Sequence, residues 1–392
     1  MSLRSACFRA LRSGPIGLLV ALTLSLVLAS QAVGGTWHTR VALTKSKDAE
    51  AAGLVTIGSS TAVVLFNDGS GLSIRRSTNS GVTWKPRQNI ADSGWYNAIA
   101  GSGTDVDIVW MDEDPGTGNV LRYRRSVDSG ATFAASLDLA TGNYNEDYFS
   151  PNVARLGSVV AVAWEDYEQS LVRIRVSTDG GASFGSTTDL AIESKVTGAR
   201  PAVAVGNGVI YAVYFIDATH VDMRRSLDNG TTWTSAIELA ADASPYDNTD
   251  AISLTASGTH AYLAYAATSG TSKWVRYRRT INKGATWTSA VDLSSPSGAG
   301  SYHPYIFLKS NVVRVVYFEC TVSNCARNGA VVRYRQSSNG KTWTAPETVS
   351  TSGPIWADPY GVGYAGRVIV LYSAQHGTNP YTCACDVYIR TK

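Results

Sequence analysis

The sequence carries little charge, and its first 32 residues hold the whole excess of one sign. Residues 1–32 contain Arg4, Arg9 and Arg12 but no Asp or Glu, so 34 − 3 = 31 basic residues face 31 acidic residues in the remainder. Nucleic-acid-binding proteins normally show a basic excess or a basic stripe. The balance therefore argues against a nucleic-acid partner.

Long apolar segments are missing as well, except near the N-terminus. There, the three arginines precede an apolar run at residues 16–29, and the small residues Ser30-Gln31-Ala32 follow it. This order is typical of a secretory signal peptide, and the run is short for a membrane span. We therefore expect cleavage after residue 32, a single domain over residues 33–392, export to the medium or the cell surface, and no membrane insertion after cleavage. An uncleaved membrane anchor is the alternative.

Cysteines are scarce, and one of the five, Cys7, lies in the signal peptide. The other four are Cys320, Cys325, Cys383 and Cys385. An even number in an exported chain favours disulfides, with three pairings open. A four-thiolate zinc site is the alternative, although these spacings differ from the usual zinc pairs. We expect no metal and no cofactor.

The sequence does contain a repeated phrase, which returns about every fifty residues. Clear copies span residues 126–133, 177–184 and 226–233, and looser copies span 77–84, 280–287 and 337–343. Each runs from Ser or Thr through Asp or Asn and Gly to a closing Trp or Phe. Asp and Asn bond their own backbone in turns, Gly adopts left-handed conformations, and the aromatic ring buries apolar area. We interpret the copies as structural hairpin turns without a catalytic role.

Four short strands surround each copy of the phrase. A short strand is followed by a strongly apolar strand such as 159–164, then by an alternating strand such as 121–125. The repeated turn leads into a fourth strand such as 237–239. Four antiparallel strands at this period predict a propeller blade.

A seventh unit is divided between the two ends of the chain. Its first three strands fall at 359–362, 368–372 and 387–391, whereas residues 34–37 match the second half of the phrase and 41–43 match its fourth strand. We therefore predict an all-β, seven-bladed β-propeller with four-stranded antiparallel blades, in which the N-terminal strand completes the last blade and closes the ring. A six-bladed propeller is the alternative.

Binding residues are usually carried by loops on a rigid scaffold, here the links between blades at the end opposite the repeated turns. The candidates for acid/base catalysis are Glu146, Asp147, Asp247, Asp250, Tyr302 and His303. The candidates for ligand binding are Arg200, Trp95, Tyr96, Tyr144, Tyr148, Tyr246, Trp356 and Asp358. The turns between second and third strands add Asp112, Glu113, Glu165, Asp166, Asp217, His220, Glu319, Arg327 and His376.

Aromatic rings beside carboxylates and amides have the composition of a sugar site, and paired carboxylates would permit glycoside hydrolysis. Asp and Asn in such links also cap turns without any contact to a ligand. For Arg200, a structural salt bridge and a contact to a substrate carboxylate both remain open.

The repeated phrase resembles the Asp boxes (BNR repeats) of sialidases and related glycan-processing propellers. The resemblance implies a sialidase-like propeller over nearly all of the mature chain. Sialidases also carry an Arg-Ile-Pro motif and three arginines that clamp the substrate carboxylate. This sequence has no Arg-Ile-Pro, and Arg200 is the only arginine at a comparable strand entry, so a full sialidase catalytic set is not expected.

Three functions remain in view. The first is carbohydrate binding by a monomeric, exported propeller, through the face opposite the repeated turns. The second is a secreted glycosidase or polysaccharide lyase that uses the central carboxylates with Tyr302, His303 and Arg200. The third is an extracellular structural or assembly scaffold.

Overall fold

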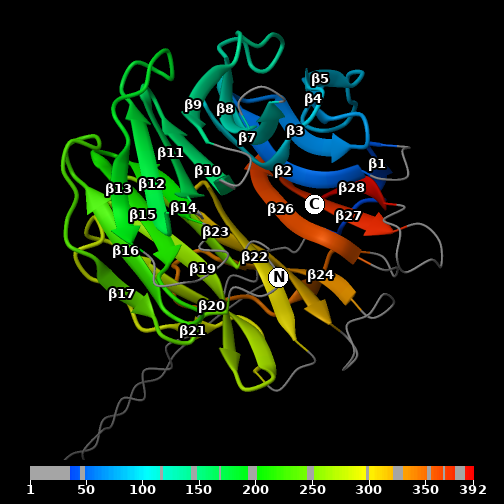
Figure 1. Cartoon of the computed structure of the whole chain (residues 1–392). Coiled ribbons are helices and arrows are strands. Elements are labelled where there is room, and N and C mark those ends of the chain that lie inside the picture. Colours follow the sequence, from blue (N-terminus) through cyan, green and yellow to red (C-terminus); the bar gives the residue numbers. More distant parts are fainter. Residues whose placement is uncertain are drawn as a thin grey trace, which may run out of the picture. The chain divides into compact units, whose positions relative to one another are not determined.

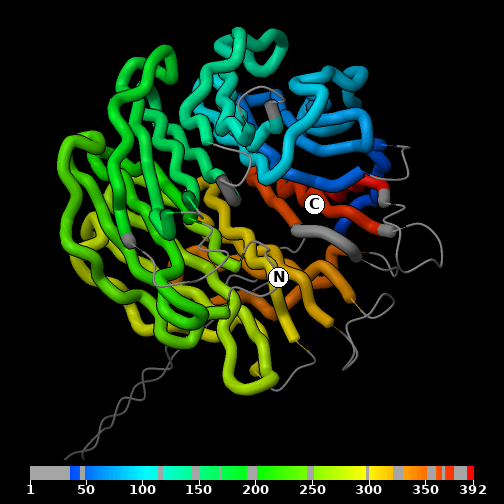
Figure 2. Tube along the Cα trace, in the orientation of Figure 1, coloured from blue at the N-terminus to red at the C-terminus, as the bar shows by residue number. Residues whose placement is uncertain are grey.

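The computed structural model describes residues 36–44, 49–114, 118–142, 148–166, 169–192, 201–244, 251–296, 300–320, 330–350, 355–364, 367–375 and 385–392. In these residues the regular structure consists of strands, and they contain no helix long and apolar enough to cross a membrane. The strands form seven antiparallel sheets of four. Figure 2 shows the chain passing from sheet to sheet in sequence order, from blue to red.

Each sheet is one blade, and its strands follow one another from the axis outwards. Blade 1 contains β2 (Ala49–Ile57), β3 (Thr61–Asp68), β4 (Leu72–Ser77) and β5 (Gln88–Ala91). Blade 2 contains β6 (Trp95–Ser102), β7 (Asp105–Asp114), β8 (Gly118–Ser126) and β9 (Leu137–Thr141). Blade 3 contains β10 (Tyr148–Leu156), β11 (Val159–Asp166), β12 (Leu171–Ser177) and β13 (Thr188–Ile192). Blade 4 contains β14 (Ala202–Gly206), β15 (Val209–Phe215), β16 (Val221–Ser226) and β17 (Ile237–Ala240).

The remaining three blades repeat this order. Blade 5 contains β18 (Ile252–Ser257), β19 (His260–Ser269), β20 (Ser272–Thr280) and β21 (Val291–Asp292). Blade 6 contains β22 (Ser301–Lys309), β23 (Val312–Cys320), β24 (Ala330–Ser337) and β25 (Glu347–Thr348). Blade 7 contains β26 (Ile355–Tyr364), β27 (Arg367–Gln375), β28 (Cys385–Thr391) and, as its outermost strand, β1 (Val41–Ala42).

Blade 7 confirms the predicted closure of the ring. In β1, Val41 pairs with Ile389 and Ala42 with Tyr388, both antiparallel. Figure 1 shows the blue N-terminal strands beside the red β27 and β28. The seven-bladed prediction is therefore correct, and the six-bladed alternative is wrong.

Trp37 shows that the divided unit also packs like the complete ones. In two complete units the aromatic ring that closes the repeated turn packs edge-on against a tyrosine of the preceding blade: Phe184 on Tyr123 and Trp343 on Tyr277, each with centroids 4.9 Å apart. Trp37 packs on Tyr334 of blade 6 in the same way, with centroids 5.4 Å apart and the planes at 81°. The N-terminal segment thus supplies both the fourth strand and the closing aromatic ring of blade 7.

The repeated turns are held by hydrogen bonds from their own residues. In the turn of blade 2, Asp128 Oδ1 accepts from the backbone N–H of Thr132 at 2.9 Å, and its Oδ2 accepts from the Thr132 hydroxyl at 2.6 Å. Gly130, at φ 76°, donates its N–H to Ser126 Oγ at 2.9 Å. These bonds explain the residue types of the phrase, and in all six complete turns they leave the Asp or Asn engaged within the turn.

The hydrophobic core is divided among the junctions between blades. Seven clusters of buried side chains each combine residues of two neighbouring blades, and the junction of blade 7 with blade 1 is among them. Trp110 and Trp164, each 1% exposed, fill two of these junctions. Because every blade contributes both faces, the sheets stabilise one another in sequence around the ring.

In six of the seven blades, one arginine of the third strand adds a polar link between blades. These arginines donate Nε to a backbone oxygen just after the repeated turn. They also donate Nη1 to a backbone oxygen at the outer strand of the preceding blade. These six are Arg75, Arg124, Arg175, Arg278, Arg335 and Arg390. Arg224 occupies the position in blade 4, and its Nε is buried without a partner among the described residues.

Candidate functional site

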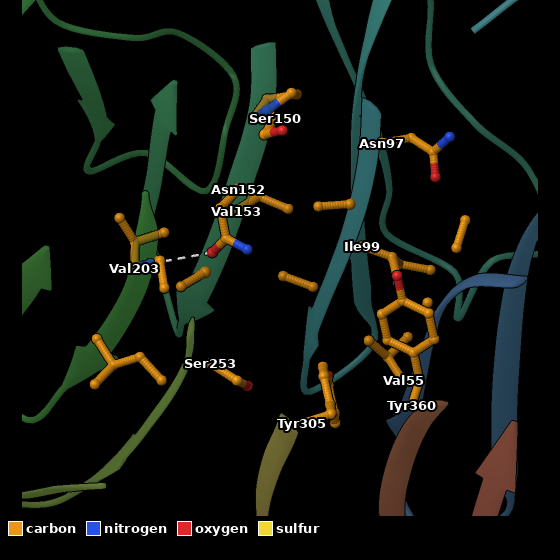
Figure 3. A pocket seen from close by; sticks show the side chains of 18 of the residues that line it. Val55, Asn97, Ile99, Ser150, Asn152, Val153, Val203, Ser253, Tyr305 and Tyr360 are labelled. Atoms are coloured by element: carbon orange, nitrogen blue, oxygen red, sulfur yellow. Dashed lines mark hydrogen bonds between the residues drawn. The ribbon is translucent and has the colours of Figure 1, made fainter. Parts of the chain in front are cut away.

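The innermost strands of all seven blades line a central channel of about 810 Å³. On β10 the lining extends from Ser150 to Arg155, which spans roughly 16 Å of strand. The channel therefore runs from the end of the blades that carries the links towards the end that carries the repeated turns. Figure 3 shows part of its wall from close by.

Bulges mark the entrance to the channel at the link end. The pairing register shifts between Trp95 and Ala98 in β6, between Phe149 and Asn152 in β10, and between Tyr302 and Tyr305 in β22. Within these bulges Tyr96, Ser150 and His303 have positive φ values of 46°, 52° and 50°. A non-glycine residue in this region costs of order 1–3 kcal/mol, and such strain gathers at functional sites, where a bulge re-aims a side chain.

Aromatic side chains from three blades line the channel. Tyr305 of β22 and Tyr360 of β26 meet edge to face, with centroids 5.2 Å apart and planes at 67°. Trp95 and Tyr96 contribute from β6, and Trp95 is 56% exposed. An exposed tryptophan at the mouth of a channel offers a surface on which a flat apolar ligand face can stack.

Neutral polar side chains also line the channel: Figure 3 shows those of β10 across from the tyrosines, whereas Ser253 of β18 lies beside β22. Asn152 Oδ1 accepts from the backbone N–H of Val203 at 3.0 Å, and Ser253 Oγ accepts from that of Ile306 at 3.1 Å. The Ser150 hydroxyl and the Asn97 carbonyl oxygen are buried and have no hydrogen-bond partner among the described residues. Buried polar atoms without partners are rare in folded proteins, so these two are candidates for contact with a ligand or water.

The charged residues of the lining include Arg155, which lies towards the end that carries the repeated turns. Its side chain is 0% exposed; Nη1 donates to Asp105 Oδ2 at 2.7 Å, Nη2 donates to Asp107 Oδ1 at 3.0 Å, and Nε contacts Asp107 Oδ2. The guanidinium also donates to the backbone oxygens of Gly157 and Gly180, each at 2.8 Å. Arg155 is fully engaged by protein groups and stabilises the junction of blades 2 and 3.

The same ion pair perturbs a buried tyrosine. The Tyr123 hydroxyl donates to Asp107, and burial, together with this carboxylate, raises the pKa of Tyr123. Burial also raises the pKa of Asp107, although Arg155 opposes the shift. Tyr123 therefore stays protonated and acts as a structural hydrogen-bond donor.

The described site candidates divide into those that reach the channel and those that do not. Trp95, Tyr96 and His303 line it. Tyr302 is not among the lining residues, and the centroid of its ring lies 6.4 Å from that of Phe318. The sequence predicted that these four residues precede the innermost strands. They lie instead inside the strands: Trp95 and Tyr96 in β6, and Tyr302 and His303 in β22. The reason is that strand pairing continues past each bulge, beyond the expected start of the strand.

Most of the other candidates fall outside the described residues. These are Tyr144, Glu146, Asp147, Arg200, Tyr246, Asp247, Asp250, Arg327 and His376. For Tyr148, Trp356 and Asp358 only the strand assignment is described, in β10 and β26.

In the part of the chain that the structure describes, the candidates from the turns between second and third strands do not line the channel. Asp112 pairs with Arg122 at 2.9 Å, and Glu319 pairs with Arg333 at 2.7 Å. Asp217 accepts from the backbone N–H of His220 at 2.7 Å. In these three turns the polar side chains are thus engaged with their own blade, as expected for capping residues.

Sequence reasoning missed several lining residues, of which Asn152, Tyr305 and Tyr360 are the most prominent. All three directly follow a proline, Pro151, Pro304 or Pro359, at the same point of the innermost strand. Alignment of the repeats on this proline would have found them. Among the described residues, no group of three or more His, Cys, Asp or Glu side chains could hold a metal ion.

No protein-family model and no curated protein matches this sequence. Solved structures do match its fold. PL25 ulvanlyase, a polysaccharide lyase, superimposes with a TM-score of 0.54 at 10% identity, over 87% of this chain and 93% of that one. A Trypanosoma rangeli sialidase in complex with sialic acid gives a TM-score of 0.50 at 12% identity, over 90% of this chain but 58% of the sialidase. YCF48 bound to D1 peptide gives 0.50 at 13% identity, over 91% of this chain and 96% of that one.

These similarities establish a sialidase-like propeller fold. The chain spans little more than half the length of the sialidase. The three neighbours also differ in what they bind, and one fold hosts many functions. The function therefore has to be argued from the channel.

Proposed function

We propose that this protein binds carbohydrate in its central channel, from the end of the blades that carries the links. The observation that carries the proposal is the pairing of an aromatic wall, Tyr305 and Tyr360, with the Asn152 amide on the other side of a cavity of about 810 Å³. Tyrosine rings stack on the apolar face of a pyranose, while amides and hydroxyls bond its hydroxyl groups.

Two further observations support this proposal. The strained bulges at Tyr96, Ser150 and His303 gather at the same end of the channel, which is the distribution expected of a functional site. In addition, two of the structural neighbours are named for carbohydrates, a sialidase with sialic acid and an ulvanlyase.

The test is retention of the purified protein on a panel of immobilised glycans and polysaccharides. Tyr305→Ala should weaken retention by about tenfold or more, the cost of losing one stacking ring. Leu227→Ala, at an exposed side chain of a repeated turn, should leave retention unchanged. If the unmodified protein is retained by no glycan, the proposal fails and the scaffold alternative is favoured.

A second candidate function is cleavage of the bound polysaccharide, as a glycosidase or a lyase. It is favoured by His303, which lines the channel, with the Tyr302 ring 6.3 Å from its own. Histidine exchanges protons near neutral pH and can act as a general acid or base. His303→Asn should then abolish release of reducing ends or unsaturated products while retaining binding. Absence of product from every bound polysaccharide would exclude this candidate.

We also propose that the protein is exported and carries disulfides. Cys320, at the end of β23, is 3% exposed and disulfide-bonded, which supports an oxidising compartment. The chain isolated from its host should start after residue 32 and show no free thiol in denaturant before reduction. A mature chain with free thiols, or an intact residue 1–32 segment, would contradict export by this route.

A further inference from the structure

Asn152 has an amide whose orientation is fixed by the neighbouring blade. It follows the bulge in β10, and its Oδ1 accepts from the backbone N–H of Val203 at 3.0 Å. Because the oxygen is held in this bond, the amide nitrogen is directed into the channel, as Figure 3 shows. No described residue accepts a hydrogen bond from that nitrogen. The channel thus contains one oriented, available N–H donor on blade 3.

The tyrosines across the channel define the other side of the same space. Tyr305 and Tyr360 come from blades 6 and 7, opposite blade 3 in a ring of seven. A ligand between these walls meets ring carbons on one side and a hydrogen-bond donor on the other. This arrangement fits a sugar ring that has an apolar face and carries an oxygen at its edge.

Charges in the described lining disfavour an acidic sugar. Glu50 of β2 lines the channel, so this position adds an acidic rather than a basic residue to the described lining. Arg155 also lines the channel, but its side chain is 0% exposed and its guanidinium is paired with Asp105 and Asp107. A ligand carboxylate would therefore have to compete with two aspartates for this cation.

We infer that Asn152 is a specificity-determining residue that selects a neutral sugar unit, one whose hydroxyl or acetamido oxygen accepts from its amide N–H. This inference rests on the proposed carbohydrate binding and names the ligand class for the same channel. Ser150, 9% exposed, lies two residues earlier on β10; its hydroxyl is buried, has no described partner and belongs to the same polar wall.

The experiment replaces the donor and keeps the structural bond. In Asn152→Asp, a carboxylate oxygen can still accept from the Val203 N–H, but the N–H directed into the channel is lost. Binding is measured by calorimetry with neutral hexasaccharides of glucose, mannose and N-acetylglucosamine, and with an oligogalacturonate of equal length. We expect the full-length protein to bind a neutral oligosaccharide, and Asn152→Asp to weaken this binding about tenfold or more.

Ser373→Ala is the matched control. Ser373 Oγ accepts from the backbone N–H of Ala51 at 2.8 Å, so it also holds the innermost strand of a neighbouring blade, but it does not line the channel. Its loss should leave affinity within about twofold, because only a link between blades is removed. An equal loss of affinity in Ser373→Ala would show that Asn152 acts through structure and would overturn the inference.

Other outcomes separate this inference from the proposed function. If Asn152→Asp binds as tightly as the unmodified protein while Tyr305→Ala does not, carbohydrate binding stands and the role of Asn152 is wrong. If the oligogalacturonate binds and the neutral sugars do not, the neutral class is wrong. If no glycan is bound at all, both proposals fail together.

Discussion

Leu43 and Ile389 pack in one hydrophobic cluster across the seam of the ring, although they come from opposite ends of the chain. Leu43 is 3% exposed, and its backbone N–H donates to the oxygen of Val387 at 2.8 Å. The seam therefore contributes to stability through both burial and strand pairing.

Leu43→Ala should lower the free energy of unfolding by about 2–5 kcal/mol, as other buried leucine truncations do. Deletion of residues 34–44 should destabilise the whole ring, because it also removes the outermost strand of blade 7. The control is Val291→Ala, at a 37%-exposed side chain on the outermost strand of blade 5, where a much smaller change is expected. Denaturant unfolding measures all three variants, and a deletion variant as stable as the intact protein would contradict the seam.

The repeated turns predict a specific acid sensitivity. Hydrogen bonds from Thr132 and Thr232 outweigh desolvation and lower the pKa of Asp128 and of Asp228 to about 2, and hydrogen bonds from Ser183 lower that of Asp179. Because these values lie below the unfolded value of about 4, the three carboxylates stabilise the fold above that pH. Their contribution is lost as the pH falls from about 4 towards 2.

In the other three complete turns an asparagine, which cannot titrate, replaces the aspartate; these residues are Asn79, Asn282 and Asn339. They indicate that Asp→Asn is the variant to test. In each of these turns the Asn Oδ1 accepts the same backbone N–H. The triple variant D128N/D179N/D228N should thus lose less stability than the unmodified protein between pH 4 and pH 2. Melting curves at each pH test this, and parallel curves for the two proteins would refute it.

The arginine links predict that the same Arg→Lys substitution lowers stability more in blade 3 than in blade 4. Arg175→Lys should cost about 1.5–3 kcal/mol, because Lys cannot reach both backbone oxygens that Nε and Nη1 now contact at 2.7 Å. Arg224→Lys is the matched variant in blade 4, where these bonds are missing among the described residues. We expect it to cost about 1 kcal/mol or less. Equal losses in the two variants would show that the links contribute nothing specific.

His303 has a strained backbone conformation and also lines the channel. Its φ of 50° suits glycine, so His303→Gly should leave stability unchanged or raise it by about 1 kcal/mol, since relief of strain is partly offset by chain entropy. The same change removes the imidazole from the channel and should reduce binding or turnover. His260→Gly, in β19 away from the channel lining, has negative φ and should only destabilise. If His303→Gly keeps full binding and turnover, His303 has no functional role.

The fold could be predicted because it depends on local rules that repeat. The Asp128 and Gly130 positions reappear in successive turns, since each hairpin needs the same backbone bonds and the same positive φ. Even the divided blade was visible, because Trp37 keeps the aromatic position of the phrase. Such features need no knowledge of distant contacts.

The site could be predicted only in part, because it depends on directions that the sequence does not show. At the bulge in β22, two adjacent residues differ in position: His303 lines the channel, whereas Tyr302 does not. Asn152 gains its orientation from the backbone of Val203, in the next blade. In the sequence, nothing distinguishes Arg155 from other strand arginines. Only the structure shows that it is paired with Asp105 and Asp107 of the preceding blade.

The most direct test of the central claim is hydrogen–deuterium exchange of the protein with and without a retained glycan. The account predicts slower exchange at residues 95–98, 148–152 and 302–305, where the bulged strands enter the channel, and no change at the repeated turns 128–133 and 228–233. Protection at the repeated turns, with the three bulged segments unchanged, would contradict it.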